Sequence, residues 1–346
     1  MAVDTAPATS DTRTRLASRR YLAAYLTTGV LLTMIGRMLW VWVGYGLAYE
    51  ENSVSDLLRA LVDPSVRLDT MMLGRNQWAV GGALMVVGLL ALMRRTAARG
   101  AAMVLAAIIA WAAVRELIGI ASDPEFRSSY FGDTALAAPI IGSWLFALAA
   151  AVSVLIMMGR SGTADHRMLP GSEERPYLIS GVLMLFLGLA TLGWLLRRYI
   201  DPVSAGSAFA DNHLLDYAEG LVNAGGPMLT EFAGSEAFYE TAYAVGFLVL
   251  GTLALLRRPV ARGGALVLSS IMLYLNLRQL AGITFTGQET PATSPLPTDR
   301  VFIPSWGSYA GSWEGRLWLA TLVLGTIAAA TVLVMLLRAP GRVLVR

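Results

Sequence analysis

The sequence predicts an all-α, polytopic membrane helix bundle with about eight transmembrane helices, arranged as two tandem, parallel four-helix repeats. Of its 346 residues, 55% are hydrophobic and 15% are charged, whereas an ordinary globular domain has about 25% charged residues. Eight apolar stretches approach the length that crosses about 30 Å of hydrocarbon as a helix. They lie near residues 21–46, 77–93, 101–120, 138–158, 177–196, 241–256, 264–283 and 317–337.

An internal repeat relates the first four stretches to the last four. Residues 84–110 align without a gap with residues 247–273, at a constant offset of 163 residues. The alignment pairs three arginines of each half: Arg94, Arg95 and Arg99 with Arg257, Arg258 and Arg262. Because four crossings return the chain to the same side, the two units are predicted to share one orientation about an axis along the membrane normal.

The repeat divides the chain at a polar linker that contains Gly, Ser, Asp, Pro and Glu. The predicted organisation is an N-terminal tail (1–20), a first four-helix unit (21–158), the linker (159–176), a second four-helix unit (177–337) and a C-terminal tail (338–346).

The distribution of arginine predicts the orientation in the membrane. The two tails and three short connections hold 16 of the 27 basic residues, all of them arginine, but five of the 24 acids. Since arginine collects in short cytoplasmic segments, both termini are predicted to be cytoplasmic, in a multi-pass protein of the plasma or inner membrane. The net charge of +3 gives no reason to expect nucleic acid as a partner.

Two of the long outer connections carry an amphipathic pattern. Residues 53–64 and 212–227 each place apolar residues at helical spacing and end at a proline. Two interpretations fit: short helices that lie on the outer membrane surface, or helical caps packed on the outer end of the bundle.

Charged residues recur near the outer ends of the third and seventh stretches. AVRELIGI (113–120) contains Arg115 and Glu116, and NLRQLAGI (276–283) contains Arg278 and Gln279. On the facing helices, Gln77 corresponds to Glu240, so each unit has one arginine, one glutamate and one glutamine. An ion pair within each unit would partly offset the desolvation of its charges. Arginines that snorkel to the interface are the alternative interpretation.

Arg37 lies about 16 residues into the first stretch, where a charge is costly without a partner. We expect Glu116, Glu240 or a bound anion to pair with it, or helix packing to explain it. The candidate ligand-binding residues are therefore Arg37, Arg115, Glu116, Glu240, Arg278, Gln77 and Gln279, with Trp111 and Tyr274 as aromatic neighbours. The sequence indicates no metal site and identifies no catalytic residue.

Residues 240–273, ETAYAVGFLVLGTLALLRRPVARGGALVLSSIML, and their copy at 77–110 resemble the second and third helices of DoxX/DoxD-like membrane proteins. Those proteins are four-helix units in which an acid opens the second helix and arginine with small residues forms the inner turn. Glu240 matches the acid, whereas Gln77, the tandem copy and the long outer loops depart from the pattern. The resemblance implies a membrane subunit linked to quinone reduction, as in thiosulfate:quinone oxidoreductase. Without cysteine, this chain has no thiol chemistry of its own.

Three functions are compatible with these features. The first is a subunit of a redox complex that binds a quinone non-covalently within the bilayer. The second is a structural or assembly subunit whose outer loops dock other membrane or extracytoplasmic proteins. The third is a transporter for a small anion or acid, in which the arginines select for charge.

Overall fold

The computed structural model describes residues 21–49, 53–62, 75–131, 134–161, 174–200, 213–225, 232–285 and 306–338. Within these ranges the chain is helical and contains no strand. The eight long helices are α1 (Leu22–Tyr49), α3 (Arg75–Leu92), α4 (Ala97–Ser122), α6 (Thr134–Arg160), α7 (Glu174–Ile200), α9 (Phe232–Leu255), α10 (Val260–Phe285) and α12 (Trp313–Arg338). The short helices are α2 (Val54–Val62), α5 (Pro124–Phe131), α8 (His213–Gly220) and α11 (Trp306–Gly311).

The all-α membrane bundle predicted from the sequence is confirmed. Seven of the long helices are long and apolar enough to cross a membrane, and the apolar part of α3, Asn76–Leu92, is shorter. At 1.5 Å per residue its 17 residues span about 26 Å, close to the hydrocarbon thickness. Short helices α2 and α8 form within the two predicted amphipathic segments, whereas α5 and α11 were not expected.

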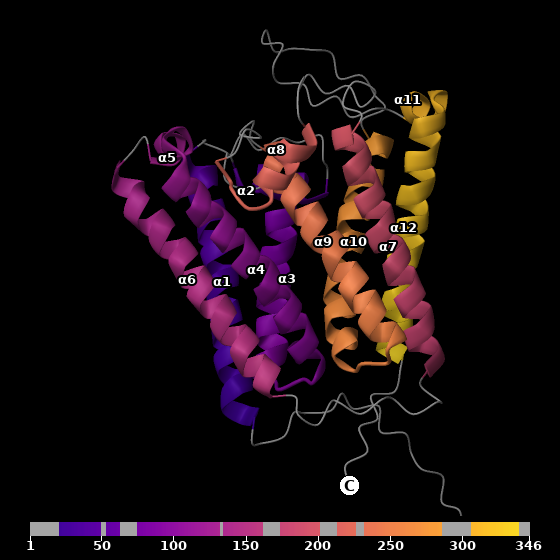
Figure 1. The fold of residues 1–346 in the computed structure, drawn as a ribbon, viewed down its shortest axis with the longest axis horizontal. Helices are drawn as coiled ribbons and strands as arrows, with labels where there is room; N and C mark the ends of the chain where they lie inside the picture. Colours follow the sequence, from indigo (N-terminus) through magenta and orange to yellow (C-terminus); the bar gives the residue numbers. More distant parts are fainter. Residues whose placement is uncertain are drawn as a thin grey trace, which may run out of the picture.

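The two four-helix units lie side by side (Figure 1). The first contains α1, α3, α4 and α6, and the second contains α7, α9, α10 and α12, with α4 packed against α10 between them. The four short helices gather at one end of the bundle, here called the cap end. The turns between α3 and α4 and between α9 and α10 mark the opposite end, here called the turn end.

The turns at the turn end have the same backbone structure in both units. Arg94 and Arg257 each have a φ of 56°, an uncommon conformation for a residue other than glycine. In the first turn the amides of Arg94 and Arg95 donate to the carbonyls of Ala91 and Leu90 at 2.8 and 2.9 Å. The second turn repeats both bonds 163 residues later. This is the Schellman arrangement that ends a helix, so the repeat extends to backbone geometry.

Glycine allows the two units to pack closely at their interface. A Cβ at Gly100 of α4 would meet the carbonyl oxygen of Val260 in α10, and a Cβ at Gly263 would meet that of Ala97 in α4. These contacts are equivalent under the repeat, so the pseudo-twofold axis passes between α4 and α10 at this level. Small residues permit such close approach in membrane helices.

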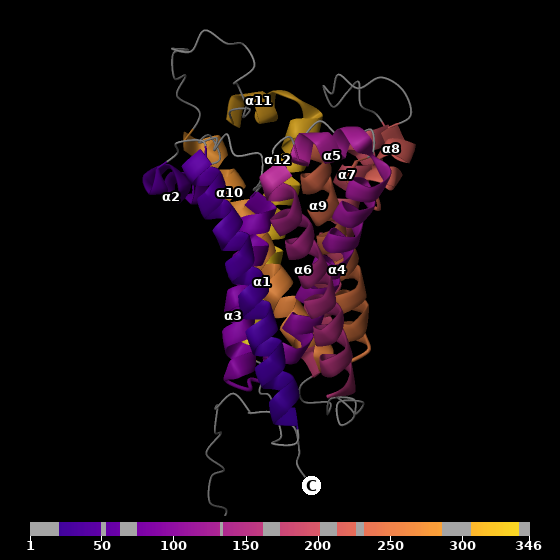
Figure 2. The same ribbon diagram turned by 90° about the vertical axis from the view of Figure 1, so that its left-hand side faces the viewer.

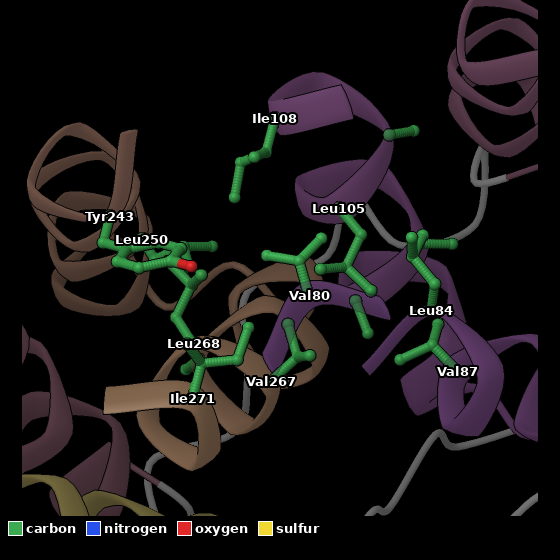
Figure 3. Packing of buried hydrophobic residues seen from close by; sticks show 14 of the residues in the cluster. Val80, Leu84, Val87, Leu105, Ile108, Tyr243, Leu250, Val267, Leu268 and Ile271 are labelled. Atoms are coloured by element: carbon green, nitrogen blue, oxygen red, sulfur yellow. The ribbon is translucent and has the colours of Figure 1, made fainter. Parts of the chain in front are cut away.

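Apolar side chains fill the rest of the interface. Figure 3 shows side chains from α3 and α4 facing side chains from α9 and α10 across it. Those labelled are Val80, Leu84, Val87, Leu105 and Ile108 from the first unit, and Tyr243, Leu250, Val267, Leu268 and Ile271 from the second.

The glycine crossing yields a prediction about stability. Gly100→Ala should lower the midpoint of thermal unfolding in detergent, because the added methyl meets backbone that cannot move aside, and such overpacking costs about 1–3 kcal/mol. Gly142→Ala is the matched control, since a Cβ at Gly142 has no neighbour within 4 Å. Its midpoint should stay level or rise, because alanine has the higher helix propensity. Equal midpoints for the two variants would contradict the tight crossing.

Candidate functional site

Arg115 of α4 and Arg278 of α10 are buried rather than placed at the bundle surface. Their exposed fractions are 6% and 9%, although each lies seven residues before the end of its helix. Burial of a guanidinium group is costly unless its donors are satisfied. The partners of these donors therefore decide what the two arginines do.

Both arginines donate to backbone carbonyls of a short helix from the opposite unit. Arg115 Nε donates to the Gly220 oxygen of α8 at 2.5 Å. Arg278 Nε donates to the Ala60 oxygen of α2 at 2.9 Å.

The two aromatic candidates make the neighbouring bonds. Trp111 Nε1 donates to the Leu221 oxygen at 2.8 Å, and Tyr274 Oη donates to the Leu61 oxygen at 2.8 Å. The donors are 163 residues apart in sequence and the acceptors 160 residues apart. The four bonds therefore form two equivalent pairs.

These bonds cap the C-terminal ends of the short helices. The last carbonyls of a helix lack intrahelical partners and carry partial negative charge, which a cation stabilises. A hydrogen bond with an ionised donor is roughly twice as strong as a neutral one. Arg115 and Arg278 thus have a shared structural role, and each fastens one unit to the other.

The two arginines differ in their remaining contacts. Arg115 Nη1 forms an ion pair with Glu116 Oε1 at 2.8 Å, and its guanidinium carbon lies 5.3 Å from the centre of the Phe238 ring. The guanidinium carbon of Arg278 lies 5.9 Å from the centre of the Trp78 ring. The ion pair predicted for the first unit is present, and it buries the Glu116 carboxylate.

The other candidate residues separate into three places. Gln77 is half-buried near the start of α3, and Glu240 and Gln279 line a cavity in the second unit. Arg37 is exposed on α1, on the stripe that includes Met34 and Val41. No residue within the described ranges forms an ion pair with Arg37. The structure therefore does not gather the nine candidates into one site.

The cavity lies among α7, α9, α10 and α12 and has a volume of about 370 Å³. Its polar lining comes chiefly from Glu240, Gln279, Asn276 and Asn76. Its remaining walls are mostly aliphatic and aromatic and include two threonines: Phe186, Leu187, Ala190, Thr191, Trp194, Tyr243, Met272, Leu275, Tyr309, Trp318, Thr321, Leu322 and Gly325. An apolar slot with a few convergent polar groups is the usual form of a small-molecule site.

Asn76 is the residue that the sequence did not single out. It belongs to α3 of the first unit but lines the cavity of the second, and 2% of its surface is exposed. Neither its amide nitrogen nor its amide oxygen has a hydrogen-bond partner among the described residues. An unsatisfied buried amide costs about 1–3 kcal/mol, so a ligand that bonds to Asn76 would recover this free energy. The sequence feature that could have identified Asn76 is its position as a second polar residue, next to Gln77, at the start of an apolar helix.

An aromatic pair forms a flat wall of the cavity at its cap end. The rings of Tyr309 in α11 and Trp318 in α12 stack with centres 4.6 Å apart and planes 11° apart. Burial raises the pKa of Tyr309, so its hydroxyl is protonated at neutral pH and remains a hydrogen-bond donor.

Comparison of the chain with protein-family models, curated proteins and solved structures finds no match. The chemistry of the cavity is therefore the guide to function.

Because each arginine caps a short helix of the opposite unit, the structure predicts which short helix each arginine stabilises. Arg278→Met should reduce amide protection in α2, and Arg115→Met combined with Glu116→Gln should reduce it in α8. Glu116→Gln is included because Arg115→Met alone would remove the ion-pair partner of the buried Glu116 carboxylate. A loss of about 1–2 kcal/mol corresponds to roughly 5- to 30-fold faster exchange, which hydrogen-exchange mass spectrometry would detect.

The two variants serve as controls for each other. In each, the short helix held by the intact arginine should keep its exchange rate. Equal acceleration in α2 and α8 by both variants would show general destabilisation and contradict the cross-unit caps.

Proposed function

We propose that this integral membrane protein is a subunit of a redox complex and binds a quinone in the cavity of its second unit. The observation that supports this proposal is the convergence of Glu240, Gln279, Asn276 and the unsatisfied Asn76 amide on one slot with apolar walls. A DoxX/DoxD-like ancestry is part of the same proposal.

A quinone matches the chemistry of this lining. Its ring carbonyls accept hydrogen bonds, which the side-chain amides of Asn76, Asn276 and Gln279 can donate. Its flat ring suits the stacked Tyr309–Trp318 wall, and its apolar tail suits the aliphatic surfaces. The Glu240 carboxylate is a group that can exchange protons with a bound quinol.

The cavity gives less support to transport of a small anion. Its described lining contains one carboxylate, Glu240, and no arginine. Arg115 and Arg278, which could have selected an anion, donate to helix carbonyls. A carboxylate-lined slot repels an anion rather than attracting it.

Exposed aromatic residues at the cap end favour assembly with other subunits. Trp306 of α11 and Trp313 of α12 are exposed to 43% and 73%, and tryptophan is enriched where proteins bind each other. A partner seated here would lie beside Tyr309 and the cavity. We propose that the partner is another membrane or extracytoplasmic subunit, which supplies the remaining redox chemistry.

Quinone binding can be tested by quenching of intrinsic tryptophan fluorescence, because Trp194 and Trp318 line the cavity. Titration of the purified protein in nanodiscs with decylubiquinone or menadione should give saturable quenching. Gly325→Leu, which places a side chain in the slot, should abolish the saturable component. Asn76→Leu should weaken binding about tenfold, the equivalent of 1.4 kcal/mol.

Two controls separate binding from damage to the fold. Gly193→Leu adds the same side chain to α7 at a position where a Cβ has no neighbour within 4 Å, and it should bind as the native protein does. Asn76→Leu should also raise the thermal midpoint without quinone, because it removes an unsatisfied buried amide. Quenching that stays linear with both probes, or that Gly325→Leu leaves unchanged, would overturn the proposal.

We propose that the protein lies in the plasma or inner membrane with its turn end in the cytoplasm. The support is the group of arginines at that end, which includes Arg94, Arg95, Arg257 and Arg258, since arginine marks cytoplasmic segments.

The orientation predicts the outcome of two fusions to the C-terminus in a bacterial host. Green fluorescent protein, which folds in the cytoplasm, should fluoresce, and alkaline phosphatase, which requires export, should be inactive. Active alkaline phosphatase with dark fluorescent protein would reverse the proposed orientation.

A further inference from the structure

Short helix α2 has more apolar surface than it buries. Leu57 and Ala60 pack against Val43 of α1 and Trp78 of α3. At about 100° per residue, Val54, Leu58 and Val62 form a second stripe beside the buried one. Their exposed fractions are 68%, 59% and 62%. Arg59 lies on the third side, so the helix presents one face to the bundle, one apolar face outward and one polar face.

Short helix α8 repeats this arrangement 160 residues later. Tyr217, the counterpart of Leu57, packs against Leu195 of α7 and Ala237 of α9. The outward stripe consists of Leu214, Ala218 and, just past the helix end, Val222, all exposed. Glu219 occupies the position of Arg59. The polar residue changes sign between the copies while the outward stripe stays apolar, so the apolar stripe is the shared feature.

The cap contacts place both stripes at the depth of the membrane spans. Ala60 is bonded to Arg278, which lies six residues before the end of the candidate span Val260–Thr284. Gly220 is bonded to Arg115, which lies seven residues before the end of the span Ala97–Ser122. At 1.5 Å per residue the two arginines lie about 9 and 10.5 Å before the ends of their spans. The C-terminal ends of α2 and α8 therefore lie beside the last turns of the bundle and not above them.

The two helices also lie on opposite sides of the molecule. Figure 2 shows α2 and α8 projecting from the two flanks of the cap end. An outward face at this depth lies at the level of the lipid-facing surface of the bundle, to which the exposed Val41 and Tyr45 of α1 belong. An amphipathic helix in the boundary between headgroups and acyl chains buries its apolar face by about 5–10 Å.

We propose that α2 and α8 are paired interfacial anchors whose outward apolar stripes insert into the same leaflet of the bilayer. The occupant of these stripes is lipid, at the level where headgroups meet acyl chains. The polar sides with Arg59 and Glu219 face water. Because each anchor is capped by the opposite unit, the pair fixes the tilt of both units relative to the membrane surface. This inference does not depend on quinone binding.

The chain has no cysteine, so a single introduced cysteine gives one labelling site. Spin labels attached through Leu58→Cys and Ala218→Cys would report the outward stripes, and labels through Arg59→Cys and Glu219→Cys are the matched controls. The protein is reconstituted into vesicles of phosphatidylethanolamine and phosphatidylglycerol. Collision rates are then measured with oxygen, which concentrates in lipid, and with a water-soluble nickel chelate.

The expected result is a ratio of oxygen to chelate collisions above one at positions 58 and 218 and below one at positions 59 and 219. Chelate collisions that dominate at all four positions would show that the stripes face water. Low collision rates with both reagents at 58 and 218 would show that protein covers them. Either result overturns the proposal, and Val62→Cys and Leu214→Cys supply replacements if a first variant does not fold.

Discussion

The exchange of helix caps between the two units is the interaction on which the rest of the structure depends. Arg115 and Arg278 are buried cations in a membrane bundle, and each is stabilised because it donates to carbonyls at the negative end of a short helix. Neither unit contains both partners of such a bond. Separation of the units would leave a buried arginine without its acceptor and a short helix without its cap, and both are costly. The units therefore act as one body even though each has its own four helices.

This constraint explains why the cavity takes residues from both units. The crossing at Gly100 and Gly263 brings α4 and α10 together near the turn end, and the caps hold the units together at the cap end. Helix α3 is then held against α10 and places Asn76 in the lining of the second unit's cavity. The same caps hold α2 and α8 on opposite flanks, where their apolar stripes face outward. Cavity and anchors thus follow from one arrangement of the two units.

The sequence predicted the helices and the repeat because both depend on local patterns. Apolar length identified the eight long helices, and constant spacing between the arginines identified the duplication, which the identical turns at Arg94 and Arg257 confirm. The partners of the arginines could not be read from the sequence, since exchange between units and pairing within a unit leave the same pattern. Arg37 was expected to have a partner because of its depth, yet helical phase places it on the exposed stripe of α1. Asn76 was not predicted because it lines the cavity of the second unit, although it belongs to the first unit in sequence.

The residues that differ between the two units are better candidates for a functional site than the residues that both units share. The arginines and their aromatic neighbours are retained in both units, as expected for residues that hold the fold. The carboxylates are not equivalent: Glu116 is buried against Arg115, whereas Glu240 lines the cavity. Asn76 and Asn276 line the same cavity, and their counterparts under the repeat are Tyr239 and Ala113. A polar group kept in an apolar slot lowers stability unless something binds it. The cavity of the second unit therefore brings together polar groups from both units, whereas the first unit buries its carboxylate in an ion pair. This difference between the copies is the reason for placing the proposed ligand in the second unit.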